Sequence, residues 1–328
     1  QPTESDASLY DLYIGAEGGV KANENCSYAF AGFENAGQIT FAGHFDTGET
    51  VSMVGMFQGC VGLTEIDLEG FRTEKVREFD QMFSRCYSLT SLDVSMFDTA
   101  GAEDFSGMFR YCRSLESLKL GGLDTKAARD LNAMFEDCAA LKELDVSGFD
   151  TARVTDMASM FEGCAALKEL DVSGFDTSRV ERMSSLFENC GSLKKLDLAG
   201  WDTSLTENMN SLFHGCASLE ELNLEGLDTS QVTSMSYMFA DCASLTSLDL
   251  KGLDVSQVTS LAGMFSGCGN LSSLLLSGWD TSGAESMSYM FADPVRALKH
   301  RIVRWAANVR CCCQDDPTLF RKLFCELL

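Results

Sequence analysis

The chain has 328 residues, 45% of them hydrophobic, and a formal net charge of −24 at pH 7. This composition can bury a large core, but so negative a chain is a poor partner for nucleic acid, because few cations are present to neutralise phosphates. The same charge disfavours an anionic membrane surface, and no apolar run in the sequence is long enough to span a bilayer.

The N-terminal part is less regular than the middle of the chain. The polar residues from Gln1 onward are typical of a terminus left after signal cleavage or trimming. Residues 11–46 then show a weak form of the later pattern, one residue out of step, with Phe33 where a cysteine is expected. Terminal units of repeat arrays are usually atypical because one face must meet water. We therefore predict an N-terminal segment and a capping coil within residues 1–49.

Residues 50–293 follow a constant step of 26 residues. A fixed period in this range indicates a solenoid, because no unit can bury its apolar face alone and the units must stack. The step is marked by cysteines with no insertion between them, at Cys60, Cys86, Cys112, Cys138, Cys164, Cys190, Cys216, Cys242 and Cys268.

Within one unit, two spacings of apolar residues predict two kinds of element. Leu170 and Val172 flank Asp171 in the period-2 pattern of a strand, and Phe175 returns to the core after a Ser-Gly turn. The other spacing, i, i+3, i+4 and i+7, predicts about two turns of helix with Thr155 as N-cap. The expected fold is an α/β, leucine-rich-repeat-like solenoid with one short parallel strand and one short helix per coil. The residues at positions i, i+3, i+4 and i+7 of the expected helix are Met157, Met160, Phe161 and Cys164.

These residues resemble a known family. The pattern Leu-x-x-Leu-Asp-Val/Leu-Ser-Gly-Phe-Asp-Thr-Ser-x-Val-Thr-x-Met-x-x-Met-Phe-x-x-Cys is similar to the BspA-like leucine-rich repeats of bacterial surface proteins and lipoproteins, in their 26-residue form. The resemblance spans residues 50–293, and ten phenylalanines from Phe57 to Phe291 keep its register. It implies a secreted or surface-anchored solenoid used in adhesion or partner binding, and it brings no catalytic residues.

Residues 294–328 differ in composition from the repeats, with seven basic and three acidic residues. Two apolar stripes at helical spacing predict two amphipathic helices, the second beginning at Pro317 after Asp316. We expect these helices to form a basic cap over the open end of the solenoid. Contact with a membrane or a partner is the alternative use of such helices, and a fusion or a shifted reading frame is another possible origin of the segment.

The cysteines and histidines give no clear sign of chemistry. The nine in-register cysteines continue the inward stripe of Met and Phe, which favours buried thiols over metal ligands or a disulfide ladder. A disulfide, free thiols and zinc all remain open for the group Cys311, Cys312, Cys313 and Cys325. The recurrent Asp-Thr-Ser turn has a structural explanation, and the three histidines fit no nucleophilic pattern. We expect no cofactor, no metal and no catalytic residue.

The outward face of the predicted sheet is the candidate functional surface. Strands stacked about 4.8 Å apart would place its acidic side chains in lines. Like charges at that spacing need counterions, a basic partner or the neighbouring lysines Lys142, Lys168, Lys194 and Lys195. The candidate binding residues are Asp93, Asp145, Asp171, Asp197, Asp249, Glu143 and Glu169.

The sequence thus predicts a non-enzymatic extracellular or cell-surface protein whose strand face binds a protein or glycan partner. A purely structural spacer that projects another module is the alternative. A merely solvated face is the simplest explanation of the charges.

Overall fold

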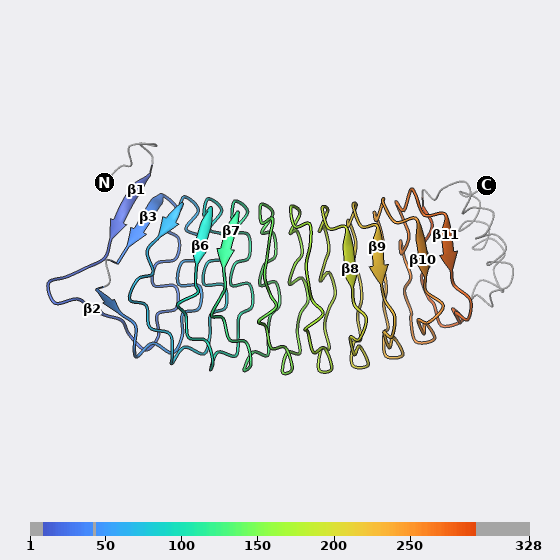
Figure 1. Ribbon diagram of the computed structural model, residues 1–328, viewed down its shortest axis with the longest axis horizontal. Helices are drawn as coiled ribbons and strands as arrows, with labels where there is room; N and C mark the ends of the chain where they lie inside the picture. Colours follow the sequence, from blue (N-terminus) through green and yellow to red (C-terminus); the bar gives the residue numbers. More distant parts are fainter. Residues whose placement is uncertain (1–8, 42–43, 293–328) are drawn as a thin grey trace. The chain divides into compact units, whose positions relative to one another are not determined.

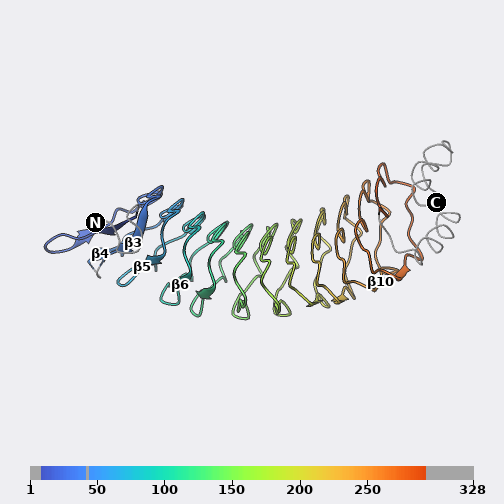
Figure 2. The ribbon, with the colours of Figure 1, turned by 90° about the horizontal axis from the view of Figure 1, so that it is seen from above.

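The computed structural model describes residues 9–41 and 44–292, and the chain divides into two units, Gln1–Leu170 and Asp171–Leu328. Each unit is a stack of parallel coils, a β-solenoid, in which every coil lies against the next one along the chain (Figure 1). Seen from above, each coil is a narrow loop viewed nearly edge-on (Figure 2). The described residues contain no α-helix, and hence none long and apolar enough to cross a membrane.

The first unit begins with a three-stranded parallel sheet and a separate strand pair. Gln38 pairs with Glu65, an offset of 27 residues, whereas Asp93 pairs with Lys119 at the regular offset of 26. The first coil is therefore one residue longer than its successors. The three-stranded sheet contains β1 (Tyr10–Tyr13), β3 (Ala36–Thr40) and β5 (Glu65–Ile66), and the pairs are β2 (Val20–Lys21) with β4 (Phe45–Asp46) and β6 (Ser91–Asp93) with β7 (Ser117–Lys119).

The second unit repeats the same short parallel strands. Leu196 pairs with Leu222 and Leu248 with Leu274, again 26 residues apart, so that equivalent side chains stack in columns. The strands are β8 (Lys195–Asp197), β9 (Glu221–Asn223), β10 (Ser247–Asp249) and β11 (Ser273–Leu275), paired β8 with β9 and β10 with β11.

The predicted helix in each coil is wrong. Two residues of the segment, Ser159 and Gly163, have positive φ values of 58° and 71°, and a right-handed helix admits no such residue. The same two positions are left-handed in coil after coil. At one of them the ring of Tyr237 lies over Gly263, where an added Cβ would clash with a ring carbon. Glycine at that position therefore provides both the backbone conformation and the space for the neighbouring ring.

Tandem turns take the place of the helix, with alternating hydrogen-bond partners. Met56 donates its N–H back to Met53 at 3.2 Å, a three-residue turn, while Phe57 donates to Met82 of the next coil at 2.9 Å. Every second N–H thus turns the chain and the others join the coils. The predicted cap also lies elsewhere, because Asp156 opens the segment by accepting the N–H of Ala158 at 3.0 Å through Oδ1, whereas the Thr155 hydroxyl contacts Arg129 of the coil before.

The inward assignments of the sequence pattern are confirmed. Met157, Met160, Phe161 and Cys164 are each 0% exposed, so the turns bury the same spacing that a helix would. The phenylalanines stack along the solenoid, with ring centroids 5.5 Å apart between Phe57 and Phe83 and interplanar angles near parallel. Buried threonines form a second column, exemplified by the Thr99 hydroxyl, which donates to the carbonyl of Asp124 at 2.9 Å and accepts its N–H at 2.8 Å.

The predicted helical cap of residues 294–328, with its cysteines Cys311, Cys312, Cys313 and Cys325, lies outside the described residues. The helical cap and the state of its cysteines remain predictions.

Candidate functional site

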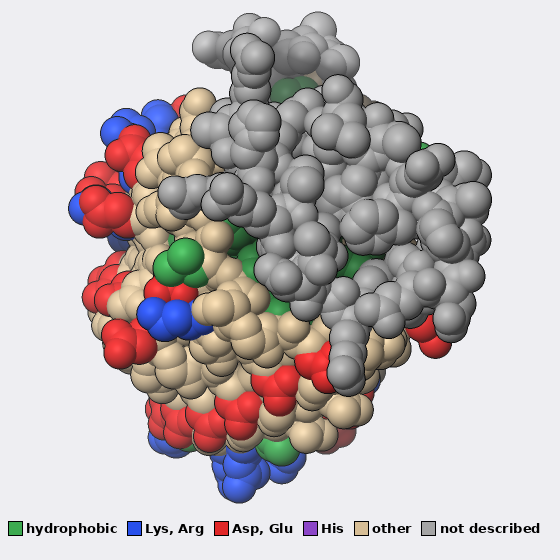
Figure 3. All heavy atoms as spheres, turned by 90° about the vertical axis from the view of Figure 1, so that its right-hand side faces the viewer, with side chains coloured by type: hydrophobic (Ala, Val, Ile, Leu, Met, Phe, Trp, Pro, Cys, Tyr) green, Lys and Arg blue, Asp and Glu red, His purple; other side chains and the backbone are tan. Residues whose placement is uncertain are grey.

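The strand side of each unit presents the candidate residues to solvent as the alternation predicted. Leu170 and Val172 are 9% and 1% exposed, while Asp171 between them faces out. The same holds in the first unit, where Glu143 and Asp145 are exposed on either side of the buried Leu144. Seen from the end of the second unit, acidic side chains gather in rows on the surface with basic ones beside them (Figure 3).

Asp145 and Asp171 also have a structural role that the sequence reasoning missed. In Asp145 and in Asp171, Oδ1 accepts the backbone N–H of the serine two residues later at 3.0 Å, and its hydroxyl at 2.6 and 2.7 Å. Each aspartate therefore closes the turn that follows it. The strand expected once in every coil is not formed beside these two aspartates, because the described residues between β7 and β8 contain no strand. The serine hydroxyl, with the serine N–H, lowers the pKa of both carboxyls, so they are ionised at neutral pH.

Asn223 shows which part of that role needs no charge. Its Oδ1 accepts the N–H of Glu225 at 3.0 Å, the same turn-closing bond that Asp197 makes to Ala199. The turn thus requires an oxygen acceptor at this position rather than a carboxylate. The negative charge of the aspartates is available for another purpose.

Two of the seven candidate carboxylates are neutralised within the protein. Asp93 Oδ2 lies 3.0 Å from Lys119 Nζ, its strand partner one coil later, and Asp249 Oδ2 lies 2.8 Å from Lys251 Nζ. Ser95, together with Lys119, lowers the pKa of Asp93 to about 2. These two residues are therefore poor candidates for binding a basic partner.

Sharing of charge with neighbouring lysines was one of the expected ways to offset the strand-face carboxylates, but Lys142 and Lys195 do not pair with the candidate aspartates. Lys142 instead contacts Glu116, 3.0 Å away and one coil earlier, and Lys195 contacts Glu221, 2.7 Å away and one coil later. Both lysines thus pair within their own columns, at the 26-residue step.

The other five candidates have no ion pair with any described residue. They are Glu143, Asp145 and Glu169 in the first unit and Asp171 and Asp197 in the second.

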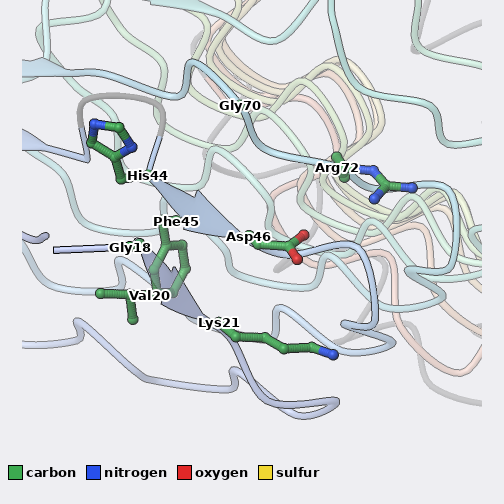
Figure 4. Close-up of a pocket in the computed structure, with 9 residues that line it drawn as sticks. Gly18, Val20, Lys21, His44, Phe45, Asp46, Gly70 and Arg72 are labelled. Carbon is green, nitrogen blue, oxygen red and sulfur yellow. The ribbon is translucent and has the colours of Figure 1, made fainter. Parts of the chain in front are cut away.

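A shallow hollow of about 430 Å³ lies beside the strand pair β2 and β4 near the start of the first unit. Lys21, Asp46 and Arg72 extend to one side of it, while His44 lies on the other (Figure 4). Asp46 is engaged in its own turn, with Oδ1 accepting the N–H of Gly48 at 3.0 Å, and Arg72 pairs with Glu74 at 3.4 Å. The hollow is open, and its charges are largely satisfied locally.

Two titratable groups on the turn side went unnoticed in the sequence. His214 lies between two carboxylates of neighbouring coils, with Nδ1 2.9 Å from Glu188 and Nε2 3.4 Å from Asp241. Burial, together with the charges of Asp104 and Glu78, raises the pKa of Asp80 to about 6. The contact of His214 with Glu188 could have been found by reading the sequence at the 26-residue step. The described ranges nevertheless hold no cluster of His, Cys, Asp and Glu placed to bind a metal ion.

The buried thiols are protonated hydrogen-bond donors. Cys112 donates through Sγ to the carbonyl of Phe83 at 3.2 Å, and burial raises the pKa of its thiol to about 12. The ten described cysteines are all free and buried. Thiols in this state are poor nucleophiles and poor metal ligands.

Comparison with known proteins shows the family of this sequence. The profile of a family described as "Mycoplasma protein of unknown function, DUF285" matches residues 24–144, 115–220 and 184–305. The chain belongs to the DUF285 family. The matched segments together cover most of this DUF285 protein and overlap one another, as expected for a repeat that a profile can match in several registers. No curated protein matches the chain.

Solved structures similar to this DUF285 protein include bacterial leucine-rich repeat proteins. One, from Bacteroides ovatus, is 18% identical, with 87% of this chain and 82% of that one covered and a TM-score of 0.33. Another, a leucine-rich cell surface protein from Faecalibacterium prausnitzii, is also 18% identical, with 85% and 86% covered and a TM-score of 0.40.

Proposed function

We propose that this DUF285 protein is a non-enzymatic bacterial surface or secreted solenoid, of the BspA-like kind, that binds a protein partner with basic side chains through its acidic strand face. The observation that carries the proposal is that each unit exposes carboxylates with no ion pair to a described residue. They are Glu143, Asp145 and Glu169 in the first unit and Asp171 and Asp197 in the second. A glycan is the alternative ligand.

The distribution of lysines supports this choice of surface. Two strand-face aspartates have a lysine partner: Asp93 pairs with Lys119 of the next coil, and Asp249 with Lys251 of its own coil. No described lysine forms an ion pair with Asp145 or Asp171, and Lys119, one coil before Asp145, pairs with Asp93 instead. Asn223 shows that an uncharged residue closes the same turn. The fold therefore does not require these unpaired charges, and a basic partner would be attracted by them.

A structural spacer is the second candidate function, and it also fits a stack of identical coils. It would require no partner on the strand face. The two functions are separated by offering the immobilised protein to extracellular proteins of a host and identifying what is retained. The informative comparison is with a variant that carries Asp145→Asn, Asp171→Asn and Asp197→Asn, since asparagine keeps the turn-closing oxygen.

A matched control removes three exposed charges elsewhere. Glu181, Glu207 and Glu285 are exposed and precede the turn segment, on a different column from the strand face. Their replacement by glutamine changes net charge by the same amount. Partner binding predicts retention of the same protein by the parent and the control but not by the strand-face variant, whereas a spacer predicts equal retention by all three.

A further inference from the structure

We propose a second interaction surface, a basic and aromatic corner patch that binds the carboxylate of an acidic sugar at the end of a glycan. The corner patch consists of Arg85, Tyr87, Arg110, Tyr111 and Arg113, all beside the cysteines of two successive coils in the first unit. It differs from the acidic strand face in position, charge and ligand chemistry.

The patch stands out against the other coils of the same chain. The residue before each core cysteine has a positive φ, and elsewhere this position is occupied by the residue types that tolerate it best, Gly, Asn or Asp. Only Arg85 and Tyr111, with φ of 62° and 63°, depart from this among the coils from Gly59 to Gly267. Neither residue is favoured by the backbone it occupies, so the fold alone does not account for them.

The position after each cysteine gives an independent sign. It holds small or aliphatic residues in the other coils, from Val61 to Gly269, but Tyr87 and Arg113 in these two. Large side chains thus replace small ones at two separate positions, in the same two coils. Their coincidence points to a surface assembled for a ligand.

The side chains form one contiguous group. The guanidinium carbons of Arg110, Arg113 and Arg85 lie 4.7, 5.3 and 6.0 Å from the ring centre of Tyr111, and Arg113 lies 5.5 Å from that of Tyr87. These distances are within reach of cation–π attraction, which holds the three positive charges together despite their repulsion.

The corner patch has one positive charge that no described carboxylate neutralises. Arg110 Nη2 is 2.8 Å from Glu136 and Arg113 Nη2 is 2.9 Å from Asp137, so two of the three guanidinium groups are paired. Arg85 is exposed and has no ion pair with any described residue. Arg110 also retains a buried Nε with no hydrogen-bond partner. One net positive charge with free donors fits a single carboxylate.

The composition of the patch favours a sugar over a peptide. Tyrosine rings offer apolar faces and hydroxyl groups to a pyranose ring, while a guanidinium binds its carboxylate. A peptide with several acidic side chains would bring further negative charge toward Glu136 and Asp137, and toward a chain whose net charge is −24. A terminal sugar acid brings one charge only.

The test measures binding of sialyllactose, with lactose as the neutral sugar and hexaglutamate as the acidic peptide. Arg85→Asn is the central variant, because asparagine suits a positive φ and should leave the melting temperature unchanged or higher. We expect it to bind sialyllactose about tenfold more weakly or worse, from loss of a charge-assisted contact. Arg153→Asn, the same charge change at another exposed arginine, should bind as the parent does.

Tyr87→Ala keeps the charges and removes a ring, so weaker sialyllactose binding by this variant supports recognition of a sugar. The proposal is overturned if the parent shows no preference for sialyllactose over lactose, or if Arg85→Asn binds it as tightly as the parent. Preference of the parent for hexaglutamate over sialyllactose would assign the corner patch to an acidic protein segment and overturn the sugar assignment.

Discussion

The thiol of Cys138 donates a hydrogen bond to the carbonyl oxygen of Phe109 in the coil before it, with Sγ 3.2 Å from that oxygen. The same carbonyl accepts the N–H of Cys112 at 3.1 Å. Each such carbonyl is thus bonded within its own coil and to the next one, and the cysteine column joins the coils. The bond needs a protonated thiol, which burial ensures by raising the pKa of Cys138 well above its usual value.

Thiol accessibility tests this role. A thiol reagent should label the ten described cysteines, Cys26 among them, only after denaturation, because all are buried. Mass spectrometry of the native protein should therefore find at most the four cysteines of residues 311–325 modified. Rapid native labelling of any peptide that contains Cys60 to Cys268 would contradict the buried assignment.

Removal of one ring from the phenylalanine stack should be costly. Phe109 is fully buried between Phe83 and Phe135, with ring centroids 6.0 and 5.7 Å away. Phe109→Ala should lower the free energy of unfolding by about 3–5 kcal/mol, the usual cost of a large core cavity. Met96→Ala, at a side chain 51% exposed, is the control and should change it little. Chemical denaturation measures both, and equal effects would show that the stack is not part of the core.

Much of the fold can be predicted from the sequence because burial repeats with a period that stacking imposes. The inward sides of Leu170 and Val172 and the outward side of Asp171 were predicted correctly, but the expected strand is absent at these residues. The helix was not, because a series of turns buries positions i, i+3, i+4 and i+7 just as a helix does. The distinguishing signal was the glycine at Gly163 and at its equivalents Gly59, Gly215 and Gly267, a residue that disfavours a helix of only two turns.

The candidate site was predicted less completely than the fold. The alternation placed the carboxylates outside, but it did not show that Asp145 also closes a turn, although a serine two residues later is a recognisable sign of that bond. The pairing of Asp93 with Lys119 could have been read from the 26-residue step. The corner patch depends on a backbone conformation that a residue pattern alone does not reveal.

Asp80 should make stability depend on pH in the acid range. Its folded pKa of about 6 exceeds the ordinary 3.8, so the folded state binds the proton more tightly and stability falls as pH rises from about 4 to above 6. Asp80→Asn should therefore stabilise the protein at pH 8, by about 1 kcal/mol after allowance for solvent screening, and not at pH 3.5. Urea denaturation at both pH values measures this, and equal effects would contradict the raised pKa.

His214 should make stability depend on pH in the range just above that of Asp80. The hydrogen bond to Glu188, aided by Asp241, raises its pKa above the ordinary 6.5, so its contribution to stability is fully present below pH 6.5 and is lost as pH rises through the folded value. His214→Gln should lower the melting temperature by several degrees at pH 5.5 and by less at pH 9. A difference that grows with pH would contradict the imidazolium bridge.

The central claim is that strand-face carboxylates with no ion pair to a described residue bind a basic partner. Its most direct test is the dissociation constant of the retained partner for the parent, for the variant Asp145→Asn, Asp171→Asn and Asp197→Asn, and for the control Glu181→Gln, Glu207→Gln and Glu285→Gln, each at low and at physiological salt. We predict that the strand-face variant binds the partner at least tenfold more weakly than the control at low salt. Raising the salt to the physiological level, where the screening length is about 8 Å, should weaken binding by the parent more than binding by the strand-face variant. Equal affinities of all three proteins, unchanged by salt, would contradict the claim.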